Sequence, residues 1–384
     1  MKPVLFEKML LTISKESVYC TIMCFMQFQH MSFFSTIELR SNNLHLSSIS
    51  SLHRSQIIDH NFFLWKDKSQ SRRCHRHCHA IGVCYGVNGD NLPSASDVVQ
   101  LYQSNGINQM RIYFLDTNAL NALSGSNIGV IMDVPNSDLS SLASDPSAAA
   151  TWVQSNVQAF PGVNFKYIAV GNEVSGGDTN SILPAMQNVN SALANAGLGN
   201  IKVSTAVQSG VTQGFPPSQG SFSQGYMGPI AQYLQSTGAP LLCNVYPYFS
   251  YTGNEAQIDL SYALFTSPGT VVQDGGNAYQ NLFDALVDTF VSALENAGAG
   301  NVGVVVSESG WPSAGGDAAT PGNAQTYNQN LINHVGQGTP KRPGSIETYI
   351  FAMFNEDQKP GAETERHFGL FNPDKSPAYP INFS

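Results

Sequence analysis

The sequence of 384 residues predicts an α/β protein, in which a single (β/α)8 barrel over residues 81–384 follows an N-terminal extension over residues 1–80. Three observations lead to this fold class. Short apolar runs recur after residue 80, helical patterns lie between them, and the composition changes at the same point. Strands that alternate with helices indicate β-α units. A barrel of this kind uses roughly 250 residues, so residues 81–384 suffice for one domain.

The extension differs from the rest of the chain in charge. It holds 10 of the 18 Lys+Arg and 5 of the 27 Asp+Glu, which gives +5 against −14 for the remainder. It lacks a clear period, and the basic start, apolar stretch and cleavage site of a secretory signal are weak or far apart. We expect residues 1–80 to be disordered, or to reflect a wrongly drawn gene start. Their clustered Cys and His residues suit zinc, but they crowd into six positions without a second ligand pair, so a metal site is not favoured: Cys74, His75, His77, Cys78 and His79.

Eight apolar runs, rich in Val, Ile, Tyr and Phe, are predicted to be the barrel strands. Their apolar residues are largely continuous rather than alternating, which suits strands buried on both faces of a parallel sheet. The runs cover residues 81–86, 110–114, 128–134, 167–170, 201–207, 241–246, 302–306 and 348–354.

Helices are predicted between these runs. Apolar residues recur at helical spacing, and Gly follows the last periodic residue of several segments, as at Gly197. A doubly wound open sheet is the alternative, but its Gly-rich turn should follow the first strand. The match at 298–303 follows a helix and precedes a strand, so it is interpreted as an αβ turn. The helical segments cover residues 96–104, 147–160, 182–196, 226–236, 282–297 and 324–335.

Composition excludes several classes of function. With eight Lys+Arg after residue 80, the body is a poor binder of phosphate backbones, so nucleic acid is not expected as a partner. No uncharged apolar run reaches 18 residues, so no membrane span is expected. His334 and His367 follow no strand, which argues against a Ser-His-Asp triad or a His-rich metal centre. Cys84 and Cys243 lie within strands as small apolar residues, although a disulfide between them stays open.

Carboxylates stand at the ends of three predicted strands. Glu173 ends the fourth strand, Glu308 the seventh and Glu356 the eighth. Catalytic residues of a barrel lie at the C-terminal ends of its strands. Two carboxylates across a barrel mouth are the apparatus of glycoside hydrolysis. Ordinary acids at the start of loops are the alternative, but a carboxylate directly after a buried strand is costly without a purpose.

Aromatic and amide side chains gather at the same strand ends. Sugar faces stack on aromatic rings, and sugar hydroxyls pair with amides and carboxylates, so these residues favour a carbohydrate ligand. Packing at the barrel rim is the alternative for each of them. The set comprises Tyr113, Phe114, Asn172, Asn244, Tyr246, Tyr248, Phe249 and Trp311.

Six motifs, in this order, resemble those of plant glucan endo-1,3-β-glucosidases of glycoside hydrolase family 17. The resemblance runs from residue 81 to residue 383, and the motif around Glu308 is highly specific. The motifs are Ile81-Gly-Val-Cys-Tyr-Gly86, Met110-Arg-Ile-Tyr113, Val170-Gly-Asn-Glu-Val174, Asn244-Val-Tyr-Pro-Tyr248, Val306-Ser-Glu-Ser-Gly-Trp-Pro-Ser313 and Phe351-Ala-Met-Phe-Asn-Glu356.

The resemblance implies an endo-hydrolase of 1,3-β-glucan with a retaining mechanism. It places the proton donor on Glu173 and the nucleophile on Glu308, and it implies no metal or organic cofactor. It also implies a cell-wall, extracellular or vacuolar protein of plant defence, although residues 1–80 show no clear signal peptide. We expect a monomer. Supporting positions fall on Tyr113, Glu356, Lys359 and Glu365.

The chemistry leads to further expectations. Glu173 should have a raised pKa, from apolar surroundings and from the charge of Glu308. A retaining enzyme needs the two carboxyl groups about 5–5.5 Å apart. Asn172 is the candidate for a hydrogen bond to the sugar 2-hydroxyl. Lys359 should pair with Glu356 or Glu365 and hold the nucleophile region in place. Tyr246 and Trp311 should line subsites, with Trp311 nearest the cleavage point.

Three other functions stay open. A hydrolase of mixed 1,3;1,4-β-glucans would share nearly all these motifs, although residues 363–374 are closer to those of the 1,3-specific members. A non-catalytic glucan-binding wall or defence protein would be marked by loss of Glu173 or Glu308, and both are present. An unrelated barrel lyase or isomerase could use the same carboxylates, but the motif set argues against it.

Overall fold

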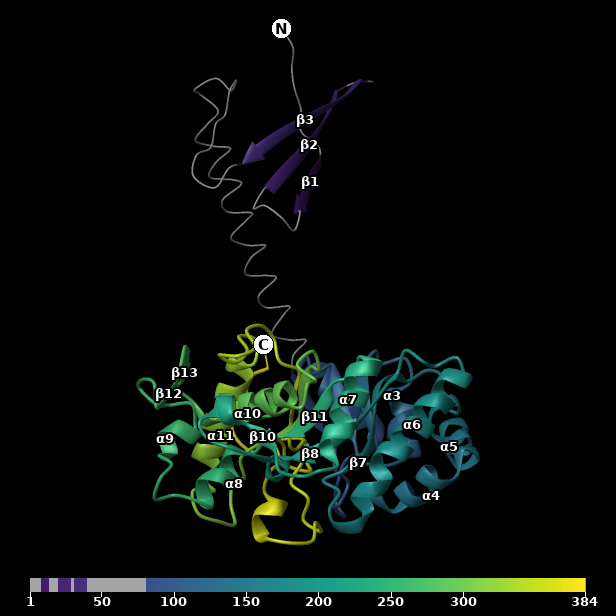
Figure 1. Ribbon diagram of the computed structural model, residues 1–384, viewed down its shortest axis with the longest axis vertical. Coiled ribbons are helices and arrows are strands. Elements are labelled where there is room, and N and C mark those ends of the chain that lie inside the picture. The colour runs from purple at the N-terminus through teal and green to yellow at the C-terminus, as the bar shows by residue number, and fades with distance from the viewer. Residues whose placement is uncertain (1–7, 14–19, 29–30, 40–80, 384) are drawn as a thin grey trace. The chain divides into compact units, whose positions relative to one another are not determined.

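The computed structural model describes residues 8–13, 20–28, 31–39 and 81–383, and the chain divides into two compact units, Met1–Gln70 and Ser71–Ser384 (Figure 1). In the first unit, β1 (Lys8–Ile13), β2 (Cys20–Phe28) and β3 (Met31–Leu39) form an antiparallel sheet in that order. For the rest of residues 1–80, the prediction of disorder concerns residues that the structure does not describe. The cysteine and histidine cluster at positions 74–79 also lies outside the described residues.

The second unit is a closed barrel of eight parallel strands, which confirms the predicted fold and all eight predicted strands. The strands pair in chain order, and the last strand closes on the first through Thr348 and Ile81. The doubly wound alternative is therefore wrong. The strands are β4 (Ile81–Cys84), β5 (Gln109–Ile112), β6 (Gly129–Val134), β7 (Asn164–Asn172), β8 (Lys202–Gln208), β11 (Leu241–Asn244), β14 (Val304–Ser309) and β15 (Thr348–Ile350).

Helices surround the barrel, as Figure 1 shows, and the six predicted segments all form. Side chains cap several helix starts; Asp116, for example, accepts the backbone N–H of Asn118 at 2.9 Å. Four short helices were not predicted, because four to seven residues give too little periodicity. The helices are α2 (Ala95–Ser104), α3 (Thr117–Leu123), α4 (Leu139–Ser144), α5 (Pro146–Val153), α6 (Thr179–Asn195), α7 (Met227–Thr237), α8 (Pro247–Thr252), α9 (Leu260–Ala263), α10 (Leu282–Asn296) and α11 (Pro321–His334).

Short elements complete the loops. A π turn (Gln154–Gln158) extends α5, and the Gly-rich segment at 298–303 connects α10 to β14, as the αβ turn predicted for it. The remaining short strands form two hairpins: β9 (Thr212–Gln213) with β10 (Ser221–Phe222), and β12 (Val272–Asp274) with β13 (Asn277–Tyr279). The 3-10 turns are Asn136–Asp138, Gly176–Asp178, Ser209–Val211, Pro217–Gln219 and Glu363–Arg366.

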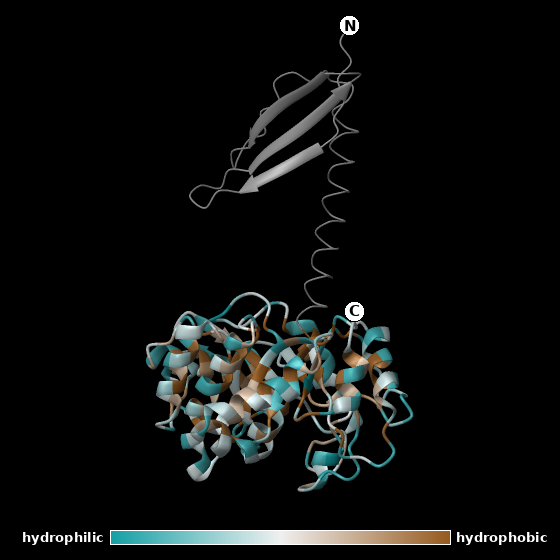
Figure 2. Cartoon of the chain, turned by 90° about the vertical axis from the view of Figure 1, so that its right-hand side faces the viewer, coloured by the Kyte–Doolittle hydropathy of each residue, from teal (hydrophilic) through white to brown (hydrophobic). Residues whose placement is uncertain are grey.

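Two apolar cores hold the barrel unit together. The larger core fills the space between strands and helices, and the smaller one fills the barrel interior with side chains such as Ile131, Leu242 and Val305. Figure 2 shows the hydrophobic residues gathered inside this unit. Cys84 and Cys243 are buried free thiols, so they act as small apolar residues and the disulfide alternative is wrong. No helix in the described part of the chain is both long and apolar enough to cross a membrane.

A polar network closes the N-terminal end of the barrel. The Glu347 carboxylate accepts a hydrogen bond from the Tyr349 hydroxyl at 2.8 Å and pairs with Lys166 at 2.7 Å. Lys166 also donates to Gln109 at 2.9 Å. These contacts join β5, the β7 strand and the β15 strand at this end, which leaves the opposite, C-terminal end for a cleft.

Candidate active site

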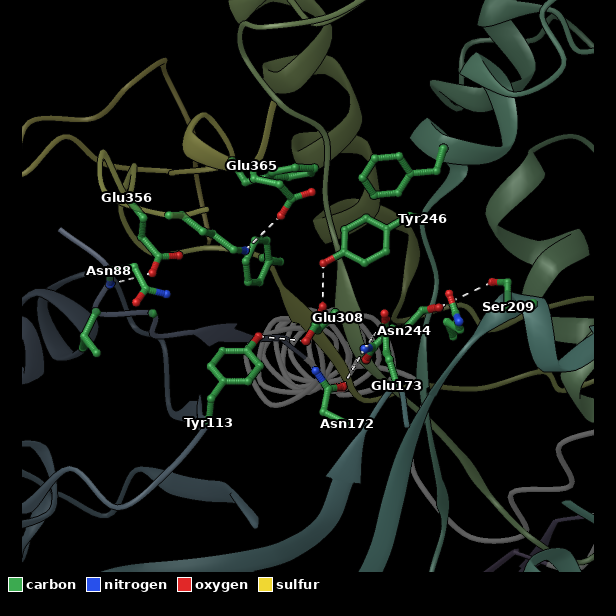
Figure 3. Close-up of a pocket in the computed structure, with 18 of the residues that line it drawn as sticks. Asn88, Tyr113, Asn172, Glu173, Ser209, Asn244, Tyr246, Glu308, Glu356 and Glu365 are labelled. Carbon is green, nitrogen blue, oxygen red and sulfur yellow. Dashed lines mark hydrogen bonds and ion pairs between the residues drawn. The ribbon is translucent and has the colours of Figure 1, made fainter. Parts of the chain in front are cut away.

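A cleft of about 650 Å³ opens at the C-terminal ends of the strands, and Figure 3 shows residues that line it. Every barrel strand except β6 ends in it or is followed within two residues by a residue that lines it. Because the strands are parallel, their carboxyl ends bring together residues that are far apart in the sequence. The lining residues include Tyr113, Asn172, Glu173, Asn244, Tyr246, Glu308, Glu356, Lys359 and Glu365.

Glu308 lies in β14 at the centre of the cleft and is 6% exposed. Its Oε1 accepts hydrogen bonds from Arg111 Nη1 and from the Tyr113 hydroxyl, both at 2.9 Å. Its Oε2 accepts one from the Tyr246 hydroxyl at 2.7 Å. All three partners are donors, and one carries a positive charge, so this buried site is built to hold an ionised carboxylate.

Arg111 is the fully buried cation beneath this site. It forms a bidentate salt bridge with Asp133, through Nε to Oδ1 at 3.1 Å and through Nη2 to Oδ2 at 2.6 Å. Burial raises the pKa of Asp133 to about 6, although the guanidinium opposes this rise. Arg111 thus compensates two buried carboxylates, one on β6 and the other in the cleft.

Glu173 directly follows β7 and reaches the same cleft. Its φ is +50°, a left-handed conformation that non-glycine residues rarely adopt and that recurs at active sites. The backbone N–H donates to the Ala206 carbonyl at 2.9 Å, which helps to hold this turn. Burial and then the charge of Glu308 raise the pKa of Glu173, which confirms the predicted direction and cause.

Asn172 and Asn244 connect the two glutamates. Asn172 Oδ1 accepts hydrogen bonds from Arg111 Nη2 at 3.0 Å and from Asn244 Nδ2 at 2.9 Å. Because the oxygen is used in this way, the amide nitrogen of Asn172 is the atom that can meet a ligand in the cleft. Asn244 also donates to Glu173 Oε1 at 2.8 Å, and Figure 3 shows these side chains side by side.

Two further glutamates, Glu356 and Glu365, line the part of the cleft wall that follows β15. Glu356 is 2% exposed and accepts the backbone N–H of Asn88 at 2.9 Å, and burial raises its pKa. Lys359 pairs with Glu365 at 3.0 Å, so the expected pairing with a nearby glutamate is confirmed. Its Nζ lies 4.0 Å from the centroid of the Phe351 ring, a cation–π contact on the wall of the cleft.

The expectation for Trp311 was wrong. Its side chain is fully buried, its ring packs 5.1 Å from that of Tyr248, and its Nε1 donates to the Ala318 carbonyl at 3.0 Å. Trp311 therefore belongs to the packing beneath the rim. The exposed rings in the cleft are those of Phe114 and Phe249, which are 43% and 44% exposed.

Sequence reasoning gave no site role to Arg111 or Asp133, and it counted Asn244 only among the strand-end residues that favour a carbohydrate ligand. A signal for the first two was present, because each is a charge inside an apolar run of a body with few charges. The two histidines in the described part of the chain do not line the cleft: His334 pairs with Asp284 at 2.7 Å, and His367 pairs with Glu363 at 2.9 Å. Among the described residues, no group of three or more His, Cys, Asp and Glu side chains could hold a metal ion.

Comparison with known proteins gives consistent matches over the barrel unit. The family model described as "Glycosyl hydrolases family 17" matches residues 81–383. The acidic isoform of glucan endo-1,3-beta-glucosidase from Zea mays is 86% identical over 307 residues, which cover 79% of this chain and 92% of that protein. Lichenase-2 from Hordeum vulgare is 54% identical and covers 79% of this chain and 98% of that protein.

Solved structures give the same result. One of two plant beta-glucan endohydrolases with distinct substrate specificities superposes with a TM-score of 0.77 at 54% identity, covering 79% of this chain and 100% of that chain. A beta-1,3-glucanase and pollen allergen of Cryptomeria japonica superposes with a TM-score of 0.77 at 51% identity, covering 79% and 99%.

Proposed function

Because this chain belongs to glycosyl hydrolases family 17 and is a glycosidase, we propose that it is an endo-hydrolase of 1,3-β-D-glucosidic linkages that works by a retaining double displacement. Glu173 is the acid/base and Glu308 the nucleophile. The 86% identity to a glucan endo-1,3-beta-glucosidase, against 54% to a lichenase, favours 1,3-β-glucan over mixed-linkage glucan as the substrate.

The observation that carries the proposal is the contrast between two carboxyl groups in one cleft. Glu308 accepts three hydrogen bonds, one of them from a buried guanidinium. Glu173 accepts one hydrogen bond from an amide, and its pKa is raised by burial and by the charge of Glu308. When the surroundings of two carboxyl groups differ in this way, one group can serve as the proton donor and the other as the anion.

The proposed reaction has two steps. Protonated Glu173 gives its proton to the glycosidic oxygen while the Glu308 carboxylate attacks the anomeric carbon, so that the leaving sugar departs and a glycosyl-enzyme forms. Glu173, now ionised, takes a proton from water, which attacks the same carbon and releases Glu308. Retention needs the two carboxyl groups about 5–5.5 Å apart, which stays a prediction.

Binding in the middle of a chain needs an open cleft with surfaces for several sugars. Phe114 and Phe249 expose rings in the cleft, and sugar faces can stack on them. The amide nitrogen of Asn172 is placed to donate a hydrogen bond to a sugar hydroxyl, and we assign it the 2-hydroxyl of the glucose that is attacked. Such a bond strengthens in the transition state and helps catalysis.

The test is release of reducing sugar from laminarin by the full chain, beside Glu308→Ala and Glu173→Gln. We expect activity in the wild type that both variants lose, with the β-anomer as the first product seen by proton NMR. Activity on cereal mixed-linkage glucan but not on laminarin would overturn the assigned substrate. A folded protein without activity on either glucan would point to a glucan-binding protein, and an α-anomer would exclude retention.

A further inference from the structure

Asn244, the last residue of β11, has a fully used side-chain amide and is 1% exposed. Its Oδ1 accepts hydrogen bonds from Arg111 Nη1 at 3.1 Å and from Ser307 Oγ at 2.8 Å. Its Nδ2 donates to Asn172 Oδ1 at 2.9 Å and to Glu173 Oε1 at 2.8 Å. An amide offers two acceptor positions and two donor hydrogens, and all four are used here.

The orientation of this amide follows from its partners. A guanidinium can only donate, so the side of Asn244 that faces Arg111 must be the oxygen. The amino group then has to face Glu173, and a flipped amide would set two donors against each other. Ser307, which is fully buried on β14 beside the nucleophile, donates to the same oxygen and is compatible with this orientation.

A hydrogen bond from Asn244 has a consequence for Glu173. A protonated carboxyl group has one carbonyl oxygen, which is the better acceptor, and one hydroxyl oxygen. With an amide N–H fixed on Oε1, the protonated group keeps its carbonyl at that oxygen. The hydroxyl is then on Oε2.

We propose that Asn244 is a positioning residue that reserves Glu173 Oε1 as an acceptor, so that the proton transferred in the reaction is carried by Oε2 in both steps. This inference rests on the function proposed above. In the first step the Oε2–H bond breaks and the proton goes to the glycosidic oxygen. In the second step the same oxygen accepts a proton from the attacking water.

The electrostatics of the site agree with this role. Burial and the charge of Glu308 raise the pKa of Glu173, and the hydrogen bond from Asn244 acts in the opposite direction. Asn244 thereby limits the rise and keeps Glu173 able to act as a base in the second step. Strand β14, which carries the nucleophile, contributes to this positioning. Ser307 on β14 donates to the Asn244 amide, and that amide donates to Glu173.

Asn244→Ala tests the proposal, with kcat/KM measured against pH on two substrates. Laminarin needs protonation of its leaving group, whereas dinitrophenyl β-laminaribioside does not. We expect kcat/KM to fall about 10- to 100-fold on laminarin and by at most about threefold on the aryl substrate. The alkaline limb should move up by about one pH unit, because the hydrogen bond that favours the charged form is lost.

Two further variants sharpen the result. Ser307→Ala should shift the same limb in the same direction by less, since Arg111 still holds the amide oxygen; it carries the test if Asn244→Ala does not fold. Asn136→Ala is the matched control, because the hydrogen bonds of the Asn136 side chain go to the backbone of Asn172, at 2.8 Å in each direction. It should reduce kcat/KM equally on both substrates and leave the limb in place.

An equal loss on both substrates in Asn244→Ala, with an unmoved alkaline limb, would overturn the proposal. If the wild type hydrolysed neither substrate, the proposed function would fail while this inference could still be judged. Carbon-13 NMR of the free enzyme, with the Glu173 signal assigned from Glu173→Gln, would then compare the pKa of Glu173 in the wild type and in Asn244→Ala. A higher pKa in the variant supports the hydrogen bond, and an equal pKa refutes it.

Discussion

Replacement of Arg111 by methionine should destabilise the barrel strongly. Methionine has a similar length and no charge, so it leaves the carboxylates of Asp133 and Glu308 without their cation. These side chains are 2% and 6% exposed, and their contacts with the guanidinium lie between 2.6 and 3.1 Å. Removal of one partner of a buried ion pair costs about 3–5 kcal/mol. At roughly 2–4 °C per kcal/mol, Tm should fall by roughly 6–20 °C.

The cause of the loss can be isolated with a second substitution. If the buried carboxylates left without a cation are responsible, Asp133→Asn in the Arg111→Met background should recover part of the stability, because it removes one of them. Asp133→Asn alone completes the double-mutant cycle, and it should be destabilising because it breaks the bidentate salt bridge with Arg111. Urea unfolding of the four proteins gives the free energies.

The deficit of Arg111→Met should also depend on pH. Burial already raises the pKa of Asp133 from 3.8 to about 6, and loss of the guanidinium removes a contact that lowers it. A carboxyl group whose pKa is higher in the folded state stabilises the fold when protonated, and this contribution is lost as pH rises through the folded value. The deficit should therefore be smaller at about pH 4 than at about pH 7. Greater loss in the double variant than in Arg111→Met, or a deficit that grows on acidification, would refute the reasoning.

Three further outcomes are expected. Tyr246→Phe removes the 2.7 Å hydrogen bond to Glu308 Oε2 and should lower kcat on laminarin about 10²-fold; an unchanged kcat would show that the hydroxyl takes no part in catalysis. Lys359→Met breaks the pair with Glu365 and should lower turnover of laminarin, and intact turnover would remove the assigned role. Burial raises the pKa of Asp288 to about 6, so its contribution to stability is full below its ordinary value of 3.8 and is lost as pH rises through about 6. Tm should thus decline less steeply across this window in Asp288→Asn than in the wild type, and equal slopes would contradict this assignment.

Much of the barrel could be predicted because its strands are buried on both faces and appear as continuous apolar runs. Long helices such as α6 and α10 were predicted because they span several turns. Helices α8 and α9 were missed because six and four residues cannot establish a period. The aromatic residues at strand ends were ambiguous for a different reason. Trp311 turns into the core and Phe249 turns into the cleft, and composition at a strand end does not distinguish these directions.

The order of strands and helices, and the position of Glu173 and Glu308 at strand ends, could be predicted from local patterns, since periodicity and burial act over a few neighbouring residues. Which side chains come into contact depends instead on how the barrel closes. Arg111 is 22 residues from Asp133 and 197 from Glu308, and Asn244 is 71 from Glu173. Those contacts form when the barrel closes and brings the strand ends together. The direction of each amide, and with it the proton-bearing oxygen that we assign to Glu173, depends on donors from strands that are distant in sequence.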